Sequence, residues 1–163
     1  MREKEHLSMY GIGPLLVAVV LISTAVFGAL HWLHILPSFE IPFLKIPCRI
    51  LGVLLWIIAP IIWCLSVFKD KIDKNILENT LVTTGVYAWV RNPIYTAFLF
   101  LAWGVLLWTN NVYAIFLFLF HWIFTSILLM ETEEKWLLKA FGQKFLDYKN
   151  HVNRLFLWFP KRK

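Results

Sequence analysis

Three long stretches without a charged side chain constrain the fold of this chain more than any other feature. Residues 11–36, 50–68 and 92–130 contain no Asp, Glu, Lys or Arg. A helix that spans a bilayer needs about 20 mostly apolar residues, with a range of roughly 17–25. The third stretch is long enough for two such helices, and its Thr109-Asn110-Asn111 cluster is typical of a turn between them. The sequence therefore predicts four transmembrane helices, at about 11–36, 46–68, 93–109 and 112–131.

The composition also favours a bilayer over water as the surrounding solvent. Of 163 residues, 60% are hydrophobic and 16% are charged, against about 45–50% and about 25% in soluble domains. A domain of this size has too little interior to bury so much apolar surface. We therefore expect an all-α polytopic membrane protein that forms one domain over residues 1–163. No strand-like alternation and no Gly-x-Gly-x-x-Gly motif are present, so a Rossmann cofactor domain is not expected.

The distribution of basic residues predicts how the helices are oriented. Four helices place both termini on one side of the membrane, together with a loop at 69–92 and a tail at 132–163. Of the 16 Lys and Arg residues, all except Lys45 and Arg49 fall on that side. The positive-inside rule then predicts that the termini, the loop and the helical tail are cytoplasmic. Because these bases flank membrane helices, a nucleic-acid partner is not expected.

A segment of mixed polar and aromatic residues precedes the third membrane helix. Pro93 suits the first turn of that helix, where a backbone N–H would lack a partner. Asn92 then lies at the N-cap, where its side chain can cap the helix, and the exposed backbone donors can bind a ligand carboxylate. The alternative is an interfacial aromatic belt that consists of Tyr87, Trp89 and Tyr95.

Three glutamates, Glu131, Glu133 and Glu134, follow the fourth apolar stretch without a break in helix-forming residues. A carboxylate at the point where a helix leaves the bilayer cannot face lipid without cost. We therefore expect these side chains to turn toward water, a basic partner or a cationic ligand. Farther along, apolar residues recur at spacings of three or four, which predicts an amphipathic helix on the headgroup surface: Leu137, Phe141, Phe145, Tyr148 and Val152.

The histidines are ambiguous from sequence alone. His31 and His34 share a face near the outer end of the first helix, beside Trp32. No acid or third ligand is visible near them, so we interpret them as an interfacial pair and expect no metal site. His121 lies deeper, where a polar side chain either contributes to function or is hydrogen-bonded inside the bundle. Both a substrate contact and packing against another helix remain open for it.

The two cytoplasmic segments resemble the isoprenylcysteine carboxyl methyltransferase family and the related phospholipid methyltransferases. The family pattern Gly-x-Tyr-x-x-x-Arg-His-Pro-x-Tyr is matched here by Gly85, Tyr87, Arg91, Asn92, Pro93 and Tyr95. A Glu-Glu pair followed by Phe-Gly-x-x-Tyr/Phe-x-x-Tyr is matched by Glu133, Glu134, Phe141, Gly142, Phe145 and Tyr148. The resemblance covers about residues 77–155, and the first two helices carry no diagnostic residue.

The resemblance implies a membrane enzyme that uses S-adenosylmethionine and acts on a lipidic or prenylated acceptor that enters from the bilayer. The implied cofactor contacts are Asn79, Thr80, Leu81, Val82, Tyr87, Asn92, Pro93, Ile94, Tyr95 and Glu133. We expect Arg91, Glu133 and Glu134 to be catalytic, and Arg154 and His121 to contact the substrate. O-methylation of a prenylcysteine carboxylate is the expected reaction. The alternatives are N-methylation of a phospholipid amine and, in another class, a non-catalytic four-helix scaffold.

Three positions depart from the family pattern. Asn92 and Asn79 stand where histidines are found, and an amide hydrogen-bonds but does not titrate. Leu129 stands where eukaryotic members carry an arginine thought to hold the acceptor carboxylate. A carboxylate acceptor then requires Arg154 or Arg91 in that role, and otherwise a lipid amine is favoured. The small size of the chain favours a prokaryotic inner membrane over an endomembrane.

Overall fold

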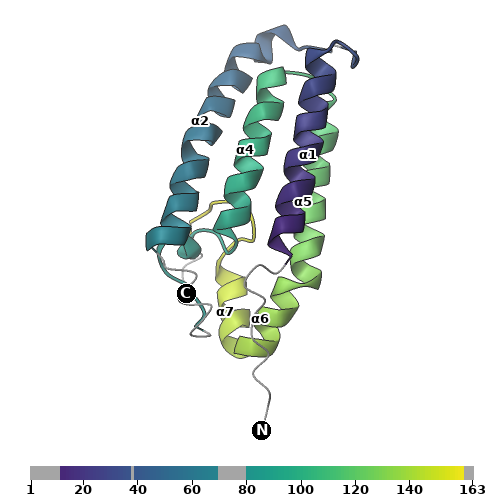
Figure 1. Ribbon diagram of the computed structural model, residues 1–163. Helices are drawn as coiled ribbons and strands as arrows, with labels where there is room; N and C mark the ends of the chain where they lie inside the picture. Colours follow the sequence, from purple (N-terminus) through teal and green to yellow (C-terminus); the bar gives the residue numbers. More distant parts are fainter. Residues whose placement is uncertain (1–11, 38, 70–79, 160–163) are drawn as a thin grey trace.

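The computed structural model describes residues 12–37, 39–69 and 80–159; in this part of the chain the regular structure is helical, apart from one isolated β-bridge. Four long helices run side by side, and two short helices lie at one end of them (Figure 1). The predicted all-α fold is confirmed. The elements in chain order are α1 (Gly13–Trp32), η1 (Pro42–Leu44), α2 (Lys45–Cys64), η2 (Leu65–Lys69), η3 (Gly85–Ala88), α4 (Pro93–Thr109), α5 (Ala114–Glu131), α6 (Glu133–Phe141) and α7 (Gln143–His151).

Three helical segments are long and apolar enough to cross a membrane, judged by length and composition. They are Gly13–Trp32, Pro42–Phe68 and Ala114–Phe141. Helix α4 is shorter, at 17 residues, and its bounds match the expected 93–109. Helix α1 ends before the expected residue 36 because His34 adopts a left-handed backbone with a φ of 57°.

The predicted turn between α4 and α5 is confirmed, and asparagine chemistry explains it. Asn110 adopts a left-handed backbone, with a φ of 46°, directly after α4. The side-chain Oδ1 of Asn111 then accepts a hydrogen bond of 3.0 Å from the backbone N–H of Tyr113. Asparagine tolerates the left-handed region and forms such local side-chain turns readily. At the same end of the bundle His31 Nδ1 lies 3.4 Å from Asn111 Nδ2, whereas His34 is exposed.

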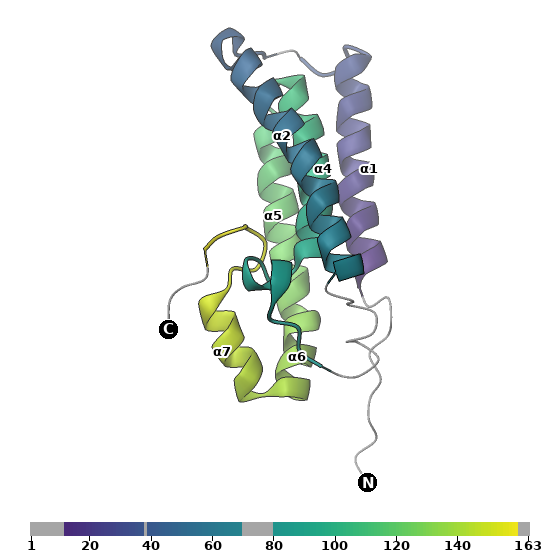
Figure 2. The same ribbon diagram turned by 90° about the vertical axis from the view of Figure 1, so that its left-hand side faces the viewer.

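Helices α2 and α4 cross closely because glycines face each other at the crossing (Figure 2). A Cβ on Gly52 would lie 3.0 Å from the carbonyl oxygen of Gly104, and a Cβ on Gly104 would lie 2.3 Å from Trp56 Nε1. Trp56 Nε1 donates a hydrogen bond of 3.2 Å to the carbonyl of Leu101. Small residues let helix backbones approach in a membrane-type bundle, where close packing replaces the hydrophobic effect between helices.

His121 joins two helices inside the bundle. Its side chain is fully buried, and Nε2 lies 2.8 Å from the hydroxyl of Ser23 on α1. The interpretation of His121 as a hydrogen-bonded interior residue is therefore confirmed. Ten residues of α5 separate it from Glu131, about 15 Å along the helix axis. His121 therefore lies away from the end of the bundle where the other candidate residues gather. Its expected contact with the substrate stays a prediction.

The tail departs from the expected surface helix. Gly142, with a φ of 55°, breaks it into α6 and α7. Phe145, Tyr148 and Val152 are buried against Leu81 of the preceding loop, so they do not lie on headgroups as predicted. After α7 the chain returns along the bundle (Figure 2). Contacts with protein therefore stabilise these three side chains, because the loop that contains Leu81 offers them a complementary apolar surface.

Candidate functional site

The candidate residues come together at the end of the bundle that carries α6 and α7 (Figure 1). There, the segment that leads into α4 runs beside the segment that follows α7. Three backbone hydrogen bonds of 2.8–3.2 Å join them, from Arg91 to Asn153, from Asn92 to Arg154 and from Trp158 to Trp89. The hydroxyl of Thr96 adds a bond of 2.9 Å to the carbonyl of Leu155. The tail is thus fixed against the start of α4.

The start of α4 has the expected first residues but not the expected side-chain cap. Pro93 is the first helical residue and Asn92 is the N-cap, as expected. The expected side-chain cap is wrong, because Asn92 Nδ2 donates to the carbonyl of Arg154 at 3.1 Å instead. The first-turn N–H groups of Ile94 and Tyr95 have no intrahelical acceptor by the geometry of a helix. They point out of the helix end, where an anion binds well.

Glu133 forms one part of the site with residues from two membrane helices. It is half-buried at the start of α6, and the hydroxyl of Tyr95 donates a hydrogen bond to its Oε1. Gly13, at the start of α1, leaves room for that hydroxyl, since a Cβ there would lie 2.9 Å from Tyr95 Oη. Sequence reasoning missed Gly13. A helix-initial glycine has no local pattern that would reveal a partner so far along the chain.

Glu134 forms the centre of a buried charge cluster. Its side chain is 6% exposed and accepts contacts from three cations: Arg91 Nη2 at 3.1 Å, Lys149 Nζ at 2.8 Å and Arg154 Nε at 2.5 Å. Burial lowers the pKa of the Arg91 guanidinium, and the charge of Glu134 opposes that shift. The predicted turn of the glutamates toward basic partners is confirmed here and at Glu131, which pairs with exposed Lys135. Lys149 was not foreseen from sequence.

Tyr87 lies where the loop meets α7. Its side chain is 7% exposed, and its carbonyl accepts a hydrogen bond of 2.7 Å from the hydroxyl of Tyr148. Burial raises the pKa of Tyr148, so this phenol stays protonated as a donor. Of the other expected cofactor contacts in the loop, Leu81 and Val82 are half-buried and Thr80 is exposed. Asn79 lies outside the described residues.

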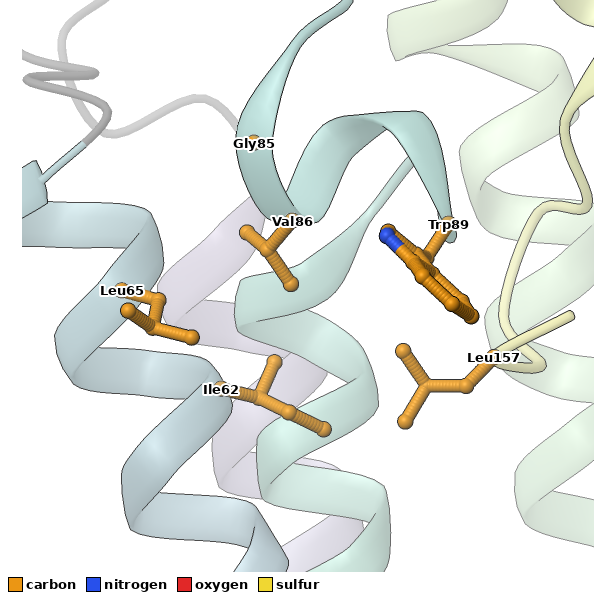
Figure 3. Close-up of a pocket in the computed structure, with 6 residues that line it drawn as sticks. All are labelled: Ile62, Leu65, Gly85, Val86, Trp89 and Leu157. Carbon is orange, nitrogen blue, oxygen red and sulfur yellow. The ribbon is translucent and has the colours of Figure 1, made fainter. Parts of the chain in front are cut away.

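An apolar cavity of about 400 Å³ lies at the same end of the bundle. It lies between the end of α2, the η3 turn and the returning tail, and Figure 3 shows its lining side chains converging from these three segments. Trp89, a member of the alternative interfacial belt, lines this cavity with its indole. The lining residues are Ile62, Leu65, Gly85, Val86, Trp89 and Leu157. A mainly apolar lining favours a hydrocarbon ligand over a polar one.

The fold is that of a helical protein of membrane type, with a cluster of polar and charged side chains and an apolar cavity at one end of the bundle. The sequence profile of the phospholipid methyltransferase family matches residues 44–144. That is more than half of the chain, which therefore belongs to this family. The resemblance seen in the two motifs is confirmed.

Several curated relatives align with about half of this chain. It is 38% identical over 80 residues to the protein-S-isoprenylcysteine O-methyltransferase of Saccharomyces cerevisiae, covering 48% of this chain and 33% of the relative. The enzymes of the same name from Mus musculus and Homo sapiens are 37% and 36% identical, each over 52% of this chain and 28% of the relative. The chain thus spans a third or less of the length of these relatives. No solved structure matches it.

Proposed function

We propose that this chain is an integral-membrane methyltransferase that uses S-adenosylmethionine and methylates the carboxylate of a prenylcysteine-like acceptor. The observation that carries the proposal is the meeting of Glu133 and Tyr95 at the first turn of α4, at the end of the bundle that also holds an apolar cavity. The side chains of Glu133 and Tyr95 and the N–H groups of the first turn of α4 suit a polar amino-acid ligand. The cavity suits a lipid chain. Family membership and the names of the relatives support the reaction class.

In the membrane, we propose four spans with the site at the cytoplasmic end. Helix α4 has 17 residues, about 25 Å at the usual rise, which is at the short limit for a span. Its packing between α2 and α1 supports its inclusion in the bundle core. The excess of Lys and Arg at the site end supports the cytoplasmic orientation.

The residues present fit the cofactor. The Glu133 carboxylate suits an ammonium or a ribose hydroxyl, and the N–H groups of Ile94 and Tyr95 suit a carboxylate. The Tyr95 hydroxyl fixes the orientation of Glu133. When bound, S-adenosylmethionine supplies a methyl group activated by a sulfonium. The main contribution of the protein is then to position the acceptor and to exclude water.

The acceptor chemistry follows from the same arrangement. An ionised carboxylate is already a nucleophile, so the chain need not supply a general base for O-methylation. The cavity beside Trp89 and Leu157 would hold the hydrocarbon chain of the acceptor. A phospholipid amine is the second candidate, which the family profile favours. It would require a group that takes up the proton released by the amine.

The first test is methyl transfer by the purified chain in lipid nanodiscs with methyl-labelled S-adenosylmethionine. Products are separated into prenylcysteine and phospholipid pools. We expect Glu133→Ala to weaken cofactor binding by about tenfold or more, since a hydrogen bond to a charged group contributes about 1.5–3 kcal/mol. Glu131→Ala is the matched control, because Glu131 is exposed and pairs only with a surface lysine among the described residues.

Two results of these experiments would contradict the proposed function. Absence of cofactor binding together with absence of transfer into either pool would exclude a methyltransferase and favour a non-catalytic membrane protein. Equal cofactor affinity of the Glu133→Ala and Glu131→Ala variants would show that the cofactor site lies elsewhere.

A further inference from the structure

Three buried polar atoms inside the bundle have no hydrogen-bond partner among the described residues. They are His121 Nδ1, Thr125 Oγ1 and Trp103 Nε1. The side chains of His121 and Thr125 are fully buried. A polar atom that loses its contact with water costs free energy unless it gains another partner, and a bilayer core offers none. These atoms therefore need a partner that the described protein groups do not supply.

Thr125 differs from the other buried hydroxyls in the described helices. Thr24 and Ser66 each donate to the carbonyl four residues earlier, at 2.7 Å. Thr96 donates to the carbonyl of Leu155 at 2.9 Å. A threonine within a helix always has such a local carbonyl within reach. Because Thr125 does not use this carbonyl, its hydroxyl is available to a partner in the bundle interior.

The contact between Ser23 and His121 defines what the free ring nitrogen requires. The Ser23 oxygen lies 2.7 Å from the carbonyl oxygen of Val19 and 2.8 Å from His121 Nε2. A carbonyl can only accept, and a hydroxyl has one proton. Both contacts are therefore satisfied only if Ser23 donates to Val19 and His121 Nε2–H donates to Ser23. In the neutral ring, Nδ1 of His121 then has a lone pair that needs a donor.

His121 and Thr125 are close enough for one small molecule to contact both. They lie one helical turn apart on the same face of α5, with Cβ atoms about 5–6 Å apart by helix geometry. Two successive hydrogen bonds of about 2.8 Å span this separation. Trp103 lies against the same part of α5, since its ring centroid is 5.7 Å from that of Phe118, three residues before His121. Its Nε1 is a donor only.

We infer that His121 and Thr125 bind a single water molecule inside the helix bundle. The water donates a hydrogen bond to His121 Nδ1 and accepts one from the Thr125 hydroxyl. A buried water needs between two and four polar partners, and Trp103 Nε1 offers a third from α4. The water completes a hydrogen-bonded chain that runs from α5 through Ser23 to the carbonyl of Val19 on α1. This site is independent of the proposed methyl transfer.

The first test detects the water at the imidazole ring. The full chain with isotope-labelled histidine is reconstituted in deuterated lipid, and magnetisation transfer from water to the ring nitrogens is measured by solid-state NMR. The His121→Phe variant identifies the His121 signals among those of the five histidines. We expect a water contact at His121 Nδ1 that is lost in Thr125→Val and kept in Thr125→Ser.

The stability of Thr125→Val is a second test, because a bonded hydroxyl and an unpaired hydroxyl predict opposite signs. Valine has nearly the shape of threonine without the hydroxyl. If Thr125 bonds a water, we expect the unfolded-to-folded ratio to rise about fivefold or more in reversible unfolding in mixed micelles. An unpaired hydroxyl predicts a lower ratio, since its burial cost disappears. The matched control is Thr24→Val, which removes a buried hydroxyl bonded only to its own helix and should change the ratio little.

Two results would overturn the inference. One is the absence of a water contact at His121 Nδ1 in the unaltered chain, which also covers a direct bond between Thr125 and His121. The other is a lower unfolded-to-folded ratio in Thr125→Val than in the unaltered chain. If Thr125→Val does not fold, the NMR measurement on the unaltered chain alone decides.

Discussion

Glu133 and Glu134 are neighbours in sequence but have opposite electrostatic surroundings. Glu134 is surrounded by three cations, so its charge is more than neutralised. Glu133 accepts a neutral hydrogen bond from Tyr95 and stays half-buried at the helix junction. A cationic ligand is therefore attracted to Glu133 and repelled from the Glu134 cluster.

Gly13 provides a test of how Glu133 is positioned. A Cβ at this residue would lie 2.9 Å from the Tyr95 hydroxyl, which contacts Glu133. We expect Gly13→Ala to move that hydroxyl and to weaken S-adenosylmethionine binding several-fold, measured by calorimetric titration. Thermal stability should change little, because the displaced atom is the end of a side chain. The control is Gly28→Ala in the same helix, where the nearest atom lies 4.0 Å from the added Cβ. Unchanged cofactor affinity in Gly13→Ala would show that Tyr95 does not position Glu133.

At the scale of elements, α2 and α4 make the most extensive contact among the described helices, and glycines face each other where they cross. Gly104→Ala would place a Cβ 2.3 Å from Trp56 Nε1 and break its hydrogen bond to Leu101. We expect this change to lower the free energy of unfolding by about 1–3 kcal/mol, the usual cost of overpacking. The measurement is reversible unfolding in mixed micelles. Gly28→Ala again serves as the control, and equal stability of the two variants would contradict a close crossing.

The sequence predicts the bounds of a helix well where the residues that start and end the helix lie at those bounds, and poorly where a distant residue sets them. The bounds of α4 were predictable because Pro93 starts the helix and the Asn110 backbone ends it. The break at Gly142 was missed because apolar spacing continues across it. The failure of Asn92 as a cap has a nonlocal cause, since the competing carbonyl belongs to Arg154.

The same distinction applies to the site. Arg91, Glu133, Glu134 and Arg154 could be singled out from motifs and charge, yet nothing in the sequence pairs Arg91 with Glu134 or Tyr95 with Glu133. Those pairs arise where the start of α6 meets the start of α4. Lys149 contacts Glu134 because α7 folds back beside α6, and Leu157 lines the cavity because the chain returns along the bundle after α7, so no local pattern revealed either residue.

At the scale of the whole molecule, the tail is part of the bundle and not an appendage. Leu155 is 2% exposed and belongs to one apolar cluster with residues of α1, α4 and α5: Leu16, Val20, Leu99, Ala102 and Leu129. Phe156 contacts the rings of Trp103 and Trp122 at centroid distances of 6.0 and 6.4 Å. The segment that contains Arg154 is therefore held by α1, α4 and α5 themselves.

This arrangement predicts that a tail residue controls both stability and function. We expect Leu155→Ala to lower the free energy of unfolding by about 2–5 kcal/mol, as for other buried leucines. Cofactor binding and methyl transfer should weaken with it, because the Thr96 bond to the Leu155 carbonyl holds the tail against α4. The matched control is Leu146→Ala on α7, where the side chain is 36% exposed and the cost should stay below about 1 kcal/mol. Equal stability of the two variants would mean that the tail rests on the bundle without contributing to its core. Loss of stability with full methyl transfer would mean instead that the site does not require the tail to be seated.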